Sequence, residues 1–189
     1  MSMGYQHACA LLDDYSVPCW GTNTAGQLGY GDNVRRNFPP ASQVVDLDGD
    51  VVRSIASGEE HSCVLLETGA VRCWGQNNYG QLGYADTINR FAPGPALDFG
   101  GHEVTSLALG GFSSCAVLDD SSVRCWGWNY YGQLGYGDGA VASEPPVAAI
   151  DLGIGRTAID VHAGTFHVCA LLDDHSFKCW GYNYFGQLG

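Results

Sequence analysis

The sequence predicts an all-β protein: a β-propeller of four-stranded antiparallel blades, with about four blades' worth in this chain. Two observations carry this prediction. A motif recurs four times, about 50 residues apart, and each copy contains strand-like runs separated by turn residues. In addition, no segment of helical length places apolar residues at the spacing of an amphipathic helix. A β-solenoid is the alternative architecture, but its repeats are usually much shorter.

The repeat is recognised by the tripeptide Cys-Trp-Gly, whose four copies are spaced 54, 52 and 54 residues apart. Each copy is followed by Gly-Gln-Leu-Gly and preceded, ten positions earlier, by a second cysteine. A glycine lies five positions before that cysteine, at Gly4, Gly58, Gly110 and Gly164. We therefore treat residues 1–189 as a single propeller segment. Its repeats cover approximately residues 4–57, 58–109, 110–163 and 164–189, and the last repeat is incomplete.

Each repeat contains a predicted β-hairpin. In HSCVLLETGAVRCWG, placing Cys63 opposite Cys73 leaves a three-residue loop at 67–69. Gly69 then occupies the third loop position, where such hairpins need a left-handed backbone. The other repeats place less permissive residues at this position, namely Tyr15, Ser121 and His175.

The eight cysteines form four pairs that the hairpins bring face to face. At a non-hydrogen-bonded antiparallel pair the Cα atoms are about 4.5 Å apart, within reach of a disulfide. Disulfides imply an oxidising compartment, so we expect an extracellular or periplasmic protein whose signal peptide is not present in this chain. Eight reduced, buried thiols are the alternative. The expected pairs are Cys9–Cys19, Cys63–Cys73, Cys115–Cys125 and Cys169–Cys179.

The pattern G-x-x-H-x-C-A-L-x-D-D-x-S-V-x-C-W-G-x-N-x-x-G-Q-L-G resembles the regulator of chromosome condensation repeat, in its cysteine-containing bacterial form. The resemblance covers essentially the whole chain. It implies a propeller, commonly of seven blades, so we expect that this chain does not close a ring alone. Missing blades or a second copy of the chain would complete it.

The same resemblance offers two functional precedents. One relative is a nucleotide-exchange factor for the GTPase Ran, which uses insertions and basic segments that this chain lacks. Guanine-nucleotide exchange is therefore not expected. Another relative is a secreted bacterial inhibitor of β-lactamases that binds through aromatic loops on one propeller face, and the loops of this chain are similar in character.

Net charge excludes one class of partner. The chain carries 8 Lys and Arg against 20 Asp and Glu, a net charge of −12, and its largest basic cluster is Arg35-Arg36. Such a surface repels phosphate backbones, so we expect no nucleic-acid binding. No apolar run is long enough to span a membrane. A zinc site would need closely spaced or converging ligands that are not visible, so we expect no metal and no cofactor.

Repeated polar residues are expected to be structural, so no catalytic residue is assigned. His7, His61 and His167 lie two positions before the first cysteine of their repeats, and Ser113 replaces them in the third. This pattern predicts a hydrogen bond to backbone in each blade. The Asp-Asp pairs of three repeats lie in hairpin turns, where Asp satisfies local backbone donors.

The loops that follow Cys-Trp-Gly differ between repeats. Their variable positions are Thr22, Thr24 and Ala25 in the first repeat but wholly aromatic in the last two. Variation on a repeated scaffold is typical of binding faces, and Tyr and Trp dominate interface hot spots. The alternative is that these rings fill gaps between blades. The candidate partner-binding residues are Gln76, Tyr79, Trp128, Tyr130, Tyr131, Tyr182, Tyr184 and Phe185.

The sequence thus favours a non-enzymatic, secreted binding propeller that recognises a protein partner through aromatic loops on one face. Two alternatives stay open. The exposed rings would also stack on sugars, which predicts a carbohydrate-binding propeller. The rings would equally join subunits, which predicts a structural module that forms a homo-oligomer. The repeated tryptophans, present in every copy, are instead expected to pack blade against blade.

Overall fold

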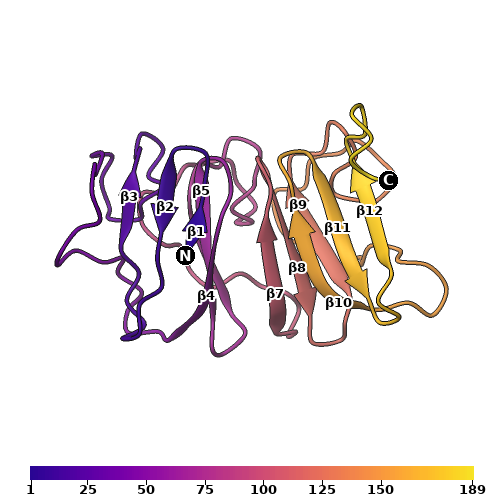
Figure 1. The fold of residues 1–189 in the computed structure, drawn as a ribbon. Coiled ribbons are helices and arrows are strands. Elements are labelled where there is room, and N and C mark those ends of the chain that lie inside the picture. Colours follow the sequence, from indigo (N-terminus) through magenta and orange to yellow (C-terminus); the bar gives the residue numbers. More distant parts are fainter.

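The computed structural model describes residues 1–189, and its regular secondary structure is entirely β-strand. Four antiparallel three-stranded sheets follow one another along the chain, and each is one blade (Figure 1). The structure has no helix of the length and apolar character needed to cross a membrane. The strands are β1 (Ser2–Met3), β2 (His7–Cys9), β3 (Cys19–Gly21), β4 (Val52–Ser57), β5 (His61–Leu66), β6 (Val71–Gly75), β7 (Val104–Leu109), β8 (Ser113–Leu118), β9 (Val123–Gly127), β10 (Ala158–Ala163), β11 (His167–Leu172) and β12 (Phe177–Gly181).

The first strand of each blade lines the propeller axis. β1 contacts β4, β4 contacts β7, and β7 contacts β10, whereas β3, β6, β9 and β12 form the outer side of their sheets. The first and last sheets lie at opposite sides of the view in Figure 1, so the four blades form an open arc. The propeller expected from the sequence is confirmed, as is the prediction that this chain does not close a ring alone.

The blades have three regular strands, not the four that we expected. In the second blade the place of the fourth strand is taken by a connector that pairs irregularly with β6. A single bridge joins Gly75 to Arg90, and the N–H of Leu97 donates to the carbonyl of Val71 at 2.9 Å. Two prolines between Arg90 and Leu97 remove the N–H donors that a continuous ladder would need.

The hairpins have the predicted turns. Cys63 pairs with Cys73, and the N–H of Leu66 donates to the carbonyl of Ala70, which leaves the three-residue loop at 67–69. Its third residue, Gly69, has a φ of 77°. The same left-handed conformation is imposed on a non-glycine residue in the other blades: Tyr15 (φ 66°), Ser121 (φ 64°) and His175 (φ 65°).

All four predicted disulfides are present, with Cα atoms 4.0 to 4.1 Å apart, and no cysteine is free. In each of the first three blades a tyrosine one residue after Gly-Gln-Leu-Gly reaches the backbone of the second cysteine. The Cys73 N–H donates to Tyr84 Oη at 2.9 Å, so the backbone of this cysteine faces away from β5. In these three blades the disulfide therefore spans a non-hydrogen-bonded pair, as expected. The equivalent tyrosines are Tyr30 and Tyr136.

The repeated tryptophans join consecutive blades, as predicted. Trp74 is fully buried, and its Nε1–H donates to the Gln27 carbonyl of the preceding blade at 3.0 Å. Its ring packs against Gly29, where a Cβ atom would lie 2.8 Å from the indole nitrogen. Trp126 and Trp180 make the same bond to Gln81 and Gln133. Three apolar clusters, one between each pair of neighbouring sheets, complete the core.

The repeated histidines also join blades, and the prediction of a backbone partner was wrong. Nε2 of His61 lies 3.1 Å from Oγ of Ser114 in the next blade, and that hydroxyl donates to the carbonyl of Gln81 at 2.8 Å. Because the hydroxyl proton is used, Nε2 of His61 is the donor. His7 makes the same contact with Ser62 at 2.8 Å.

The contact depends on the residues on both sides of the blade boundary. The third repeat has Ser113 in place of the histidine, and the fourth has Val168 in place of the serine that would receive its bond. Glycine leaves room for each ring, since a Cβ atom on Gly58 would lie 2.2 Å from Cε1 of His61. The repeated glycine and histidine therefore form one structural unit.

Candidate binding face

Two sets of loops meet at one end of the propeller. Residues 58–60 connect β4 to β5, and residues 76–81 follow β6; both lie at this end because His61 pairs with Gly75. The same holds in the other blades. We call this end the loop face. Its inner loops are residues 4–6, 58–60, 110–112 and 164–166, and its outer loops are residues 22–27, 76–81, 128–133 and 182–187.

Buried amides fix the backbone of the outer loops in the first three blades. In the third blade Oδ1 of Asn129 accepts from the Leu134 N–H at 2.9 Å, and Oε1 of Gln133 accepts from the Tyr131 N–H at 3.0 Å. Nδ2 of Asn129 donates to the Asp138 carbonyl at 3.0 Å. Both amide side chains are fully buried. The residues between them are thus held in a defined loop.

Seven of the eight candidate residues belong to one continuous cluster of rings, which we call the aromatic patch. Trp128 lies at its centre, with ring centroids 5.8 Å from Tyr79, 6.0 Å from Tyr130 and 5.4 Å from Tyr131. Tyr131 continues the chain of contacts to Tyr182 at 4.6 Å. The nine rings of the patch are Tyr79, Phe112, Trp128, Tyr130, Tyr131, Phe166, Tyr182, Tyr184 and Phe185.

The patch is open to solvent at its outer positions. Tyr130 is 74% exposed, Tyr184 78% and Phe185 81%, while Trp128 and Tyr182 are half-buried beneath them. The rings therefore do not all fill gaps between blades. The half-buried rings support the exposed ones, so that the patch presents a pre-arranged apolar surface.

The eighth candidate, Gln76, lies outside the patch. Its Nε2 donates to Glu60 Oε2 at 3.1 Å, and its Oε1 accepts from Nε2 of Gln81 at 3.2 Å. This amide therefore ties an outer loop to the inner loop of the same blade.

Two rings of the patch, Phe112 and Phe166, were missed from the sequence. They lie in inner loops, each 16 residues before the outer-loop residue that it approaches: Trp128 at 6.0 Å and Tyr182 at 6.3 Å. A signal was available, because the equivalent residues of the first two repeats are Gln and Glu. The inner position thus changes from polar to aromatic in the same repeats as the outer loops.

A hollow lies within the patch, between the third and fourth blades. It has a volume of about 420 Å³ and is walled by rings, with polar groups at its edge. Its lining residues are Tyr131, Thr165, Phe166, His167, Tyr182, Phe185 and Gln187. A cavity of this size fits a single sugar ring or one large side chain.

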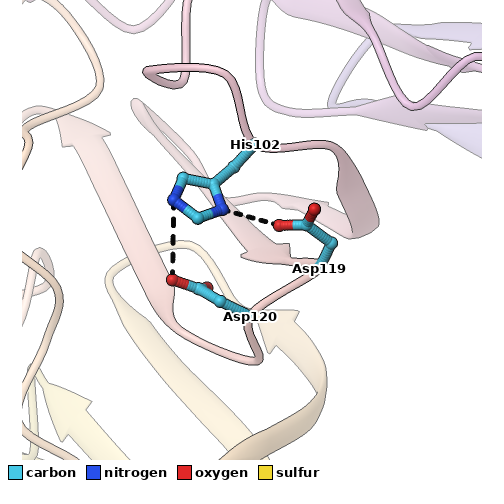
Figure 2. Close-up of side chains that lie close together, drawn as sticks. All are labelled: His102, Asp119 and Asp120. Atoms are coloured by element: carbon cyan, nitrogen blue, oxygen red, sulfur yellow. Dashed lines mark hydrogen bonds and ion pairs between the residues drawn. The ribbon is translucent and has the colours of Figure 1, made fainter.

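A second group of polar side chains lies at the opposite end of the third blade. Figure 2 shows the imidazole of His102 between two carboxylates, with Nδ1 2.7 Å from Asp119 and Nε2 3.8 Å from Asp120. The hydrogen bond from His102 holds the pKa of Asp119 below its usual value. These three residues have ligand atoms close enough for a metal ion.

The fourth blade has an equivalent contact between a basic side chain and the two carboxylates of its hairpin turn. Arg156 occupies the position of His102, two residues before the first strand, and its guanidinium lies 2.6 Å from Asp174 and 3.5 Å from Asp173. The contact of a basic side chain with the carboxylates of the hairpin turn thus recurs between repeats. His102 fills the place of that basic partner.

Comparison with known proteins identifies the repeat. A family model described as the Regulator of chromosome condensation (RCC1) repeat matches residues 16–65, 68–117 and 120–171. A second model with the same description matches residues 1–27, 52–81, 104–133 and 158–187. The matches extend over most of the chain.

Curated relatives align with the whole chain. The Ultraviolet-B receptor UVR8 of Arabidopsis thaliana is 31% identical over 189 residues, which is 100% of this chain and 42% of that protein. The Probable E3 ubiquitin-protein ligase HERC4 of Mus musculus is 35% identical over 193 residues, 100% of this chain and 18% of that protein. The chain therefore spans less than half the length of these relatives.

Solved structures share the fold. Human WBSCR16 superimposes with a TM-score of 0.86 at 26% identity, covering 99% of this chain and 48% of that one. Prp20p from Saccharomyces cerevisiae superimposes with a TM-score of 0.81 at 26% identity, covering 98% and 43%. The Prp20p structure is described together with its binding to Gsp1p and histones, so that relative binds proteins.

Proposed function

Because this chain belongs to the regulator of chromosome condensation repeat family, we propose that it is a non-enzymatic binding protein whose aromatic patch recognises a protein partner in an oxidising, extracellular or periplasmic compartment. The observation that carries the proposal is the continuous surface of nine rings on one face of a rigid scaffold. Exposed Tyr and Trp provide large contact areas at low entropic cost.

Four further observations support the proposal. The patch occupies the last three of the four blades, as a surface shaped for one particular partner would. The yeast relative Prp20p binds protein partners. The four disulfides fit an oxidising compartment. The two buried histidines have little or no contact with solvent, and burial lowers their pKa to about 4 and about 3, which argues against a role as general bases.

Carbohydrate binding is the second candidate, and one observation favours it. The 420 Å³ hollow is walled by rings and edged by His167, Thr165 and Gln187, an arrangement suited to stacking on a sugar while bonding its hydroxyls. A glycan would occupy this hollow alone, whereas a protein partner would cover the whole patch.

The test uses a variant that removes only exposed rings: Tyr130→Ala, Tyr184→Ala and Phe185→Ala together. Its matched control is Thr22→Ala with Thr24→Ala in the outer loop of the first blade, where Thr24 is the equivalent of Tyr130 and Tyr184. Wild type and both variants are presented to a displayed library of random peptides and to a glycan array. Sedimentation velocity on each protein reports self-association.

We expect peptides that bind wild type and the threonine variant, with affinity reduced at least about 30-fold by loss of the rings, as for interface hot spots. Glycans bound instead, and lost in the same variant, would favour the carbohydrate candidate. An oligomer that dissociates only in the ring variant would favour self-assembly. Equal binding by all three proteins would contradict the proposed role of the aromatic patch.

A further inference from the structure

An opening lies on the propeller axis at the loop face, beside the aromatic patch. It has a volume of about 400 Å³ and is lined by the residues where the inner strands end and the inner loops begin. Five of its twelve lining residues are glycine, so its wall is largely backbone. Glu59 is the one charged residue in this lining.

Only one of the eight loops that define this face carries charged side chains. Across the eight loops that define the face, Glu59 and Glu60 are the only charged side chains, and no Lys or Arg is present. Both glutamates are half-buried. Glu60 accepts one bond from Gln76, whereas Glu59 makes no side-chain hydrogen bond and no ion pair. These loops therefore hold two carboxylates and no basic side chain.

Partial burial makes this arrangement costly for the free protein. Desolvation raises the pKa of Glu59, and the neighbouring charge of Glu60 raises it further. A carboxylate in this environment is stabilised by a cation that enters it, because the attraction between the two charges offsets part of the hydration energy that burial removes.

The aromatic patch begins next to these carboxylates. A Cβ atom on Gly111 would lie 3.3 Å from Glu59 Oε2, so the carboxylate lies over Gly111. The following residue, Phe112, contacts Tyr79 and Trp128 at centroid distances of 5.5 and 6.0 Å. Ring faces beside carboxylates favour basic side chains, through cation–π contact and ion pairing together.

We propose that the axial opening receives an arginine or lysine side chain of the protein partner, with Glu59 as the counter-charge in its lining, Glu60 adding negative potential beside it, and the aromatic patch covering the apolar residues around it. This inference rests on the proposed function. It specifies the chemistry of the partner: an apolar surface with one basic residue that projects from it. The net charge of −12 adds long-range attraction for such a partner.

The test compares selections from a displayed library of random peptides on four proteins. These are wild type, Glu59→Gln with Glu60→Gln, the variant lacking Tyr130, Tyr184 and Phe185, and a control with Glu67→Gln and Glu103→Gln. The control makes the same charge change at exposed positions on the opposite end of the blades. Thermal unfolding checks that each variant folds.

A peptide selected on wild type is then synthesised with its basic residue and with a neutral isostere, citrulline for arginine or norleucine for lysine. Its affinity for each protein is measured by calorimetry. We expect basic residues to be enriched on wild type and on the control but not on the glutamine pair. We also expect about tenfold or greater loss of affinity from either the glutamine pair or the neutral isostere, with little further loss when both are combined.

The outcomes separate this inference from the function beneath it. Peptides that lack basic enrichment, or that bind the glutamine pair as tightly as wild type while losing affinity for the ring variant, would overturn the basic anchor and leave the binding patch in place. Selected peptides that bind the ring variant as tightly as wild type would contradict the proposed function, and the basic anchor with it.

Discussion

Acid should destabilise this fold through two buried histidines, well before its carboxylates are protonated. His7 is 5% exposed and His61 is fully buried, and burial lowers the pKa of His7 to about 4 and that of His61 to about 3. Each ring donates from Nε2 to a serine, which leaves Nδ1 to receive an added proton. Nδ1 of both rings is buried without a hydrogen-bond partner. The added proton would therefore be buried and unpaired.

The size of the effect follows from the difference in proton binding between the two states. The unfolded chain takes up protons below a pKa of about 6.5, whereas the folded rings stay neutral to about 4 and 3. The contribution of the two neutral histidines to the free energy of unfolding is thus present above about pH 6.5 and is lost as the pH falls below that value. Each pH unit costs about 1.4 kcal/mol per histidine, so the two together lose about 4 kcal/mol between pH 7 and pH 5.

Urea unfolding followed by tryptophan fluorescence, with disulfides intact, measures this loss at both pH values. The reference is His7→Gln with His61→Gln, which keeps an amide donor for each serine but does not titrate. Subtracting its pH dependence removes the contribution of the carboxylates. We expect wild type to lose about 4 kcal/mol and the variant less than about 1 kcal/mol. The same loss in both proteins would refute the assignment of acid sensitivity to the buried rings.

Three further predictions concern single residues. Gly58→Ala should lower the melting temperature by several degrees because its methyl group would meet the histidine ring three residues on at 2.2 Å, whereas Gly139→Ala, with no atom closer than 4.0 Å, should change it little. Asn129→Ala should cost about 2 to 3 kcal/mol in urea unfolding because it leaves buried loop groups unbonded, while the exposed Asn78→Ala should be nearly neutral. Ser121→Gly should stabilise the protein by about 0.5 to 1 kcal/mol because its φ of 64° is strained for serine, and an unchanged or lower urea midpoint would contradict this.

Features set by short sequence separations could be predicted from the sequence. The three-residue turn at 67–69 and its disulfide depend on residues ten positions apart, so cysteine spacing and turn composition were enough. The sequence predicted a fourth strand in each blade, but in the second blade a single bridge between Gly75 and Arg90 stands in its place. The connector contains prolines whose effect on the ladder depends on which N–H groups face the sheet.

Features that join separate repeats were harder to find. The partner of His61 lies 53 residues away in the next blade, and a within-repeat pattern cannot identify it. Ser113 replaces the histidine of the third repeat, and Val168 replaces the serine that would be its partner in the fourth. Comparing neighbouring repeats two at a time would therefore have suggested this pairing. Phe112 was missed for a related reason, because the aromatic patch combines loops that only the blade topology brings together.

The outer loops divide their residues between two tasks. Asn129, Gly132, Gln133 and Leu134 set the course of the chain and have buried side chains or special backbone geometry, while Tyr130 between them points into solvent. Mutations at the solvent-facing sites therefore change the side chains that the loop presents without lowering the stability of the fold. In evolutionary terms such a loop can explore new specificities almost neutrally. The same separation makes these sites a natural place to randomise in building artificial binders, with the amide and glycine positions held constant.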